Sequence, residues 1–87
     1  MNLTGFFLIE HLRVGLGHSG FSAVVWGQVL KRHDAEEYSA VIVCPICARL
    51  SPSEPVILMA LNHTTATAAC DELKNTVEQH MREQDSR

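Results

Sequence analysis

The chain has 87 residues, of which 46% are hydrophobic and 20% are charged, and its formal net charge at pH 7 is −3. This length allows a single domain, residues 1–87, and the hydrophobic content is typical of a globular chain rather than a disordered one. Domains that bind nucleic acid usually carry a basic stripe. The one basic cluster here, Lys31–His33, is followed at once by acids, so the charge argues against nucleic acid as a partner.

The sequence also argues against a membrane location. No segment approaches the roughly 20 consecutive apolar residues that a membrane-spanning helix needs. The apolar run at residues 5–9 lacks a basic leading segment and is too short for the core of a signal peptide. Three cysteines, an odd number without an export signal, indicate a reducing compartment, so we expect a cytoplasmic protein.

The first segment, residues 3–16, admits two interpretations. Its apolar residues have a loosely helical spacing, Thr4 is a suitable helix cap, and Gly15 could end a helix. The run Phe7–Ile9 is equally typical of the beginning of a strand. We therefore expect an N-terminal helix or an extra strand, with the helix favoured.

The glycines that follow, Gly15–Gly20, spell the G-x-G-x-x-G pattern of phosphate-binding turns. Such a turn should lead into a helix. The next segment, Phe21–Leu30, is instead rich in β-branched and aromatic residues and predicts a strand. We interpret the pattern as a glycine-rich turn that leads into this strand.

Two more strands are predicted at Tyr38–Cys44 and Val56–Leu61 because both segments are apolar runs between polar turns. The turns are the charged segment Lys31–Glu37 and the proline-containing segment Arg49–Pro55. Parallel neighbours would need a crossover of a dozen or more residues, so these strands are expected to be antiparallel.

The last segment has the clearest helical periodicity, with a cap at Thr64 or Thr65 and a polar tail, residues 83–87, that we expect to fray. Its predicted inward face consists of Ala66, Ala69, Cys70, Leu73, Val77, His80 and Met81. The fold class is therefore α+β: a small antiparallel three-stranded sheet packed against a C-terminal helix, preceded by a helix or an extra strand.

The strongest chemical signal is Cys44-Pro-Ile-Cys47, because a C-P-x-C turn after a strand is typical of a zinc knuckle. A complete site needs two more ligands, and the candidates are His63, at the end of the next strand, and Cys70. Two alternatives stay open. The cysteines are buried thiols, which also suits Cys70 on the inward helix face. Or they form a redox pair, although such pairs begin a helix and Pro45 here follows a predicted strand.

No acid–base pair or catalytic triad can be grouped from the sequence, so we do not expect an enzyme. The preferred interpretation is a non-catalytic protein-binding module, since a three-stranded sheet under one helix leaves its second face uncovered. Phe21 and Trp26 are the candidate partner-binding residues, and a homodimer through this face is a further expectation. In size and plainness the chain is similar to small phage-encoded inhibitors, anti-CRISPR proteins among them, or to a regulatory subunit.

The alternative function belongs to a different class. In it the chain is a zinc-stabilised, nucleic-acid-associated accessory domain in which Cys44, Cys47, His63 and Cys70 bind the metal. The presence of bound zinc separates the two interpretations.

Overall fold

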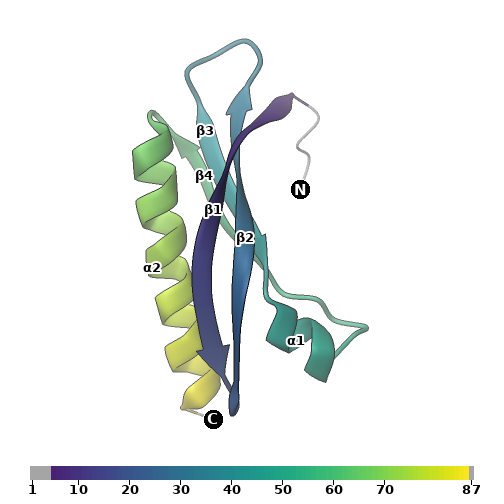
Figure 1. The fold of residues 1–87 in the computed structure, drawn as a ribbon. Coiled ribbons are helices and arrows are strands. Elements are labelled where there is room, and N and C mark those ends of the chain that lie inside the picture. The colour runs from purple at the N-terminus through teal and green to yellow at the C-terminus, as the bar shows by residue number, and fades with distance from the viewer. Residues whose placement is uncertain (1–4, 87) are drawn as a thin grey trace.

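The computed structural model describes residues 5–86 and forms an open antiparallel sheet with a long helix on one face (Figure 1). The strands follow the chain in the order β1-β2-β3-β4 across the sheet. The α+β class and the C-terminal helix are as the sequence predicts. The elements are β1 (Phe6–His18), β2 (Phe21–Arg32), β3 (Tyr38–Val43), α1 (Pro45–Leu50), β4 (Ile57–His63) and α2 (Ala66–Asp85).

The first segment is the extra strand and not the favoured helix. β1 pairs with β2 along its whole length, from Phe6 opposite Arg32 to His18 opposite Phe21. The signal that outweighs the helical spacing is an alternation of period two, in which every second residue from Leu12 to His18 faces the core. Two glycines in the same stretch would also weaken a helix. Residues 3 and 4 of the expected element lie outside the described residues.

The glycine-rich stretch divides between a strand and a turn. Only Ser19 and Gly20 form the turn, and both have positive φ, 56° and 82°. Two consecutive residues of this kind make a type I′ turn, whose twist matches the twist of the flanking strands. Gly15 and Gly17 belong to β1. The predicted turn is therefore present, but it is shorter than the glycine pattern indicates.

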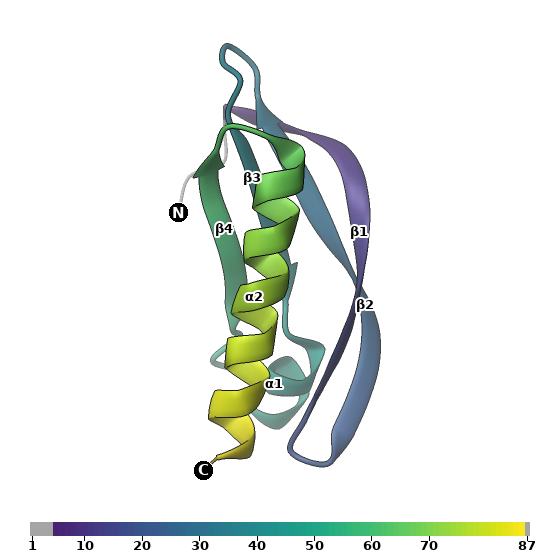
Figure 2. The same ribbon diagram turned by 90° about the vertical axis from the view of Figure 1, so that its left-hand side faces the viewer.

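Helix α2 covers one face of the sheet (Figure 2). It begins at the predicted cap, where the hydroxyl of Thr65 accepts a hydrogen bond from the N–H of Ala68. It ends at Asp85, so the helix extends three residues into the expected tail, and Arg87 lies outside the described residues. The residues of α2 that are buried against the sheet are Ala69, Leu73, Val77 and His80.

The opposite face of the sheet is open to solvent over most of its area. The large apolar side chains on it include Val24, Trp26, Val43 and Ile57, which are between 48% and 62% exposed. Their cross-strand partners place all four on the side away from α2. Neither of the two described helices is long and apolar enough to cross a membrane.

Candidate metal centre

Three separate parts of the chain meet at the hairpin end of the sheet. The first is the end of β1, where the alternation of the strand directs His18 to the buried side. The two-residue turn that follows is held against the end of α2, because the N–H of Ser19 donates to Oδ1 of Asp85 at 2.9 Å. Only 3% of the His18 surface is exposed.

The second part is the Cys44-Pro-Ile-Cys47 segment, which forms the start of a helix rather than a turn. Cys44 caps α1, and its sulfur accepts a hydrogen bond from the N–H of Cys47. Pro45 occupies the first helical position, where its fixed φ and missing N–H cost nothing. One turn of α1 therefore brings both sulfurs to the same side, and both cysteines are buried.

The third part is the C-terminal half of α2. His80 lies one turn after Val77 on the inward face of the helix and is 7% exposed. Its ring approaches the ring of His18 edge-on, with centroids 5.1 Å apart. The imidazoles of β1 and α2 thus lie next to each other at this end of the sheet.

The four side chains have the spacing of a tetrahedral metal site. Nε2 of His18 lies 3.4 Å from Sγ of Cys44 and 3.5 Å from Sγ of Cys47, and Nε2 of His80 lies 3.4 Å from Sγ of Cys47. All four ligand atoms lie within 4.8 Å of one another. Usual zinc–sulfur and zinc–nitrogen bond lengths put the nitrogen and sulfur ligands of a tetrahedron about 3.6 Å apart. The observed contacts therefore fit a bound zinc ion.

The orientation of His18 is also that of a metal ligand. Its Nδ1 lies 2.8 Å from Oγ of Ser19, while Nε2 faces the two sulfurs. If Nδ1 carries the proton and donates it to Ser19, Nε2 presents a lone pair to the centre of the cluster. A metal-bound histidine almost always uses its second nitrogen in this way.

Two of the four residues predicted as metal ligands are in the cluster and two are elsewhere. Cys44 and Cys47 lie together as expected. His63 pairs with Tyr38 at the far end of β3, and six residues of strand separate it from Cys44 by about 20 Å. Cys70 precedes His80 by ten residues of α2, which is about 15 Å along the helix axis. His18 and His80 take the two positions that the sequence assigned to His63 and Cys70.

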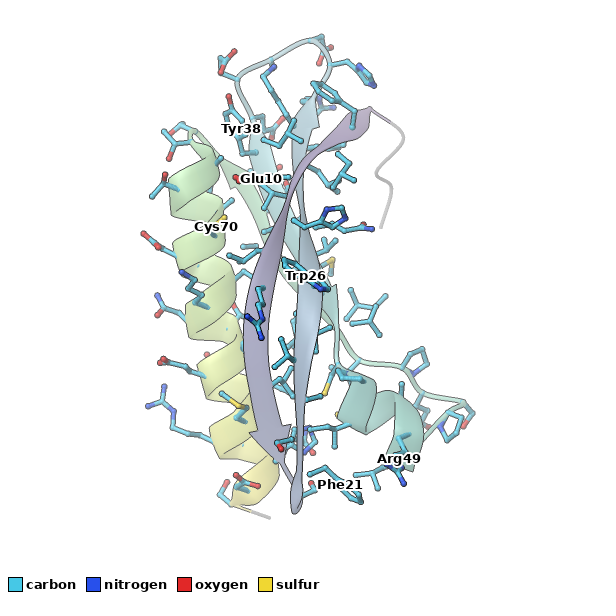
Figure 3. The ribbon with its side chains drawn as sticks, in the orientation of Figure 1. Glu10, Phe21, Trp26, Tyr38, Arg49 and Cys70 are labelled. Carbon is cyan, nitrogen blue, oxygen red and sulfur yellow. The ribbon has the colours of Figure 1, made fainter. Side chains whose placement is uncertain are left out.

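Cys70 belongs to the N-terminal half of α2 and lies in a different environment from the four clustered residues. It is partly exposed, and burial is the main reason why the pKa of its thiol is raised, with a further contribution from the charge of Glu10. Figure 3 shows both side chains in the space between β1 and α2, well away from the hairpin end.

The two predicted partner-binding residues do not share one surface. Phe21 and Trp26 are five residues apart in β2, so their side chains point to opposite faces of the strand. Trp26 lies on the open face, with 62% of its surface exposed. Phe21 is at the hairpin end, where the guanidinium of Arg49 lies 5.0 Å from the centre of its ring (Figure 3).

The sequence carries one signal for His80. Its helical periodicity places this residue on the inward helix face, and a buried polar side chain at a core position needs a partner. His18 gave no such signal, because its role depends on the strand that replaces the expected helix. Comparisons with family models, with curated proteins and with solved structures found no match. The functional argument therefore depends on the geometry of the site.

Proposed function

We propose that the chain is a zinc-stabilised, non-catalytic binding module in which His18, Cys44, Cys47 and His80 hold one Zn²⁺. The observation that carries the proposal is the meeting of four buried side chains, two thiols and two imidazoles, at mutual distances that suit one tetrahedral ion. Three separate segments supply these ligands.

The donor set favours zinc and a structural role. Two thiolates with two imidazoles are a common ligand set of structural zinc sites, and hard cations such as Mg²⁺ and Ca²⁺ prefer oxygen. Four protein ligands complete the tetrahedron, whereas catalytic zinc sites keep one position for water or substrate. The burial of all four residues supports the same role, because a substrate has no direct approach to the ion.

A structural ion would add to the folding stability of this small domain. Small domains bury a limited fraction of their surface, and a metal that binds only the folded chain adds its binding free energy to the folding free energy. Zinc would join the end of β1, the start of α1 and the last turns of α2. These three segments meet below the short strands β3 and β4, where the sheet itself does not hold them together (Figure 1).

A redox pair is the chemical alternative for the two cysteines. Such pairs lie at the start of a helix, and Cys44 and Cys47 lie at the start of α1. Their surroundings favour the metal. Reactive cysteines are partly exposed, whereas Cys44 is 0% and Cys47 is 8% exposed. Both sulfurs also face imidazole nitrogens rather than solvent.

The open sheet face with Val24, Trp26, Val43 and Ile57 supports the proposal that the chain binds another protein. Contiguous exposed apolar side chains usually mark a place where another protein is bound. Inhibitors of the phage type, regulatory subunits and homodimers all belong to this class. A nucleic-acid-associated accessory domain would contain the same zinc site. The net charge of −3 does not support binding to nucleic acid, however.

The test is the zinc content of the protein purified without added metal and measured by atomic spectrometry. We expect about one zinc per chain, and loss of that zinc in Cys44→Ser and in His80→Ala. The matched controls are Cys70→Ser and His63→Ala. They remove side chains of the same two types at positions outside the cluster, so both variants should retain the metal. A metal-free wild-type protein with an unchanged circular dichroism spectrum in chelator would refute the zinc site.

A further inference from the structure

A groove runs between the outer edge of β1 and helix α2. One hollow of about 230 Å³ is lined by residues that include Gly15, Lys74 and Met81. A second hollow of about 580 Å³ begins at Gly17 and continues to the end of α2. Glu78 and Met81 line both hollows, so the two hollows are neighbours along the strand. Figure 2 shows this side of the molecule, with α2 and the lower half of β1 next to each other.

The strand side of the groove presents backbone N–H and C=O groups that take no part in the hydrogen-bond ladder of the sheet. β1 is an edge strand, and within residues 5–86 no strand pairs with its outer side. The N–H of Gly17 points to that side, because it donates to the sulfur of Met81 at 3.1 Å. Backbone groups of an antiparallel strand alternate in direction, and the register is unbroken from Glu10 to His18. The N–H and C=O groups of Arg13 and Gly15 therefore also point into the groove.

Long edges of this kind are templates for another strand, and most proteins protect them by shortening, proline or a bulge. β1 has 13 residues, and its one irregularity lies at Leu8/Glu10, outside the groove. Gly15 adds no side chain that would keep a second backbone away, and a Cβ at this position would meet no atom within 4 Å.

We propose that this groove binds an extended peptide segment of a partner protein, which adds to β1 as a fifth strand. Main-chain hydrogen bonds to Arg13 and Gly15 supply affinity, whereas the N–H of Gly17 is already bonded to the sulfur of Met81. Alternate side chains of the peptide contact α2. The charged residues that line the hollow of about 230 Å³ are two cations, Arg13 and Lys74, and one acid, Glu78. An acidic peptide residue at that end is therefore favoured.

The inference deepens the proposed function, because the zinc ligands join the two walls of the groove. His18 ends β1, and His80 lies on α2 beside Met81. A zinc ion between these histidines holds strand and helix at a fixed distance. The open face with Trp26 lies on a different side of the sheet and is not part of this groove.

The test begins with selection of random linear peptides displayed on phage against the zinc-loaded protein. A length of about 12 residues suits an edge strand of 13 residues. Enriched peptides are synthesised with a fluorescent label, and their dissociation constants are measured by fluorescence polarisation. Gly15→Pro removes one groove-facing N–H while leaving the β1–β2 hydrogen bonds in place, and Gly15→Ala is the matched control that retains it.

We expect Gly15→Pro to weaken binding by about tenfold or more, and Gly15→Ala to bind within about threefold of wild type. A second measurement does not depend on folding of the variant. In peptides methylated at single backbone nitrogens, affinity should fall at every second position and be retained at the positions between. Lys74→Glu should weaken the peptides that carry an acid.

Three results would overturn the proposal. They are an absence of enriched peptides, peptides that bind Gly15→Pro as well as wild type, and a methylation series without alternation. A wild-type dimer in sedimentation velocity that Gly15→Pro converts to a monomer would make a second copy of the chain the occupant instead. The zinc content of each sample separates the two hypotheses. Metal-free protein that binds through Gly15 refutes only the zinc site, and zinc-loaded protein without binding refutes only the groove.

Discussion

The hydroxyl oxygen of Ser19 lies 2.8 Å from Nδ1 of His18, on the side of the imidazole ring opposite the sulfur of Cys44. The two residues are neighbours in sequence, and they meet because the type I′ turn places Ser19 at a φ of 56°. One short turn therefore reverses the chain and orients a residue of the candidate metal centre. A hydrogen bond to the outer nitrogen selects the tautomer that binds metal through the inner one.

Removal of this hydroxyl should weaken zinc binding without changing the turn. Ser19→Gly is the suitable variant, because glycine adopts positive φ without strain. Loss of such a supporting hydrogen bond typically costs 10- to 100-fold in metal affinity, so we expect a weakening of about that size. Competition with a chromophoric chelator measures it. Ser22→Ala, an exposed position in the next strand, should bind zinc as wild type does.

Removal of zinc should loosen one end of the molecule more than the other. The proposed metal would join the end of β1, the start of α1 and the last turns of α2, whereas the pairing of β2 with β3 lies toward the opposite end. After chelation we expect amide hydrogen exchange to accelerate by at least about tenfold near Cys47 and His80, equivalent to about 1.4 kcal/mol of local opening. Amides of Val29 and Ala40 should change less. Uniform acceleration across the chain would contradict a local role.

The fold was largely predictable because its signals are local. The inward face of α2 follows a period of 3.6 residues from Ala69 to Val77, and Thr65 caps the helix as its sequence context indicates. The β2, β3 and β4 segments are apolar runs between polar turns, which fix their type and their antiparallel order. For β1 the sequence left a helix and a strand open and favoured the helix, because the two patterns overlap and the partner strand β2 decides between them.

The site was predictable only in part, for a different reason. Cys44 and Cys47 are close in sequence, so their grouping in one candidate site is visible in the motif itself. Their partners come from 26 residues before Cys44 and 33 residues after Cys47. The sequence provides no register for such contacts, since they depend on the length of the β1–β2 hairpin and on which turn of α2 lies beside it. His63 is nearer to the motif along the chain but farther away in space.

Cys70 should be the one cysteine that thiol reagents reach in the zinc-loaded protein, because Cys44 and Cys47 are buried. Burial raises the pKa of its thiol, so the thiolate fraction at neutral pH is small and alkylation by iodoacetamide should be slow. The rate should increase as the pH rises toward the raised pKa. Intact-mass spectrometry counts the modified thiols, and addition of chelator with denaturant should increase the count from one to three.

Two variants near Cys70 should shift this rate in opposite directions. The charge of Glu10 raises the pKa of the thiol and the charge of Lys74 lowers it. Glu10→Gln should therefore lower the pKa and accelerate alkylation, while Lys74→Gln should slow it. Because one pKa unit corresponds to a tenfold change in thiolate fraction, we expect both effects to be smaller than about tenfold. Equal rates in the two variants would show that the charges of Glu10 and Lys74 do not control the pKa of the thiol.

The packing of α2 on the sheet depends on a glycine that the helix lies against. A Cβ on Gly27 would lie 3.3 Å from the carbonyl oxygen of Val41 and 3.4 Å from Cδ2 of Leu73, whose side chain is fully buried. Gly27→Val adds two further methyl groups at this contact, so the helix or the strand must move. We expect a loss of about 1–3 kcal/mol in the free energy of unfolding, measured by urea denaturation.

The matched control for this substitution is Gly15→Val in the neighbouring strand. A Cβ at Gly15 meets no atom within 4 Å, and valine has a high β-propensity, so stability should stay within about 0.5 kcal/mol of wild type. The difference between the two variants isolates the contact with Leu73 from the general effect of adding a side chain to a strand. If both variants have the same stability, α2 does not rest on Gly27, and the inward face of the helix must pack elsewhere on the sheet.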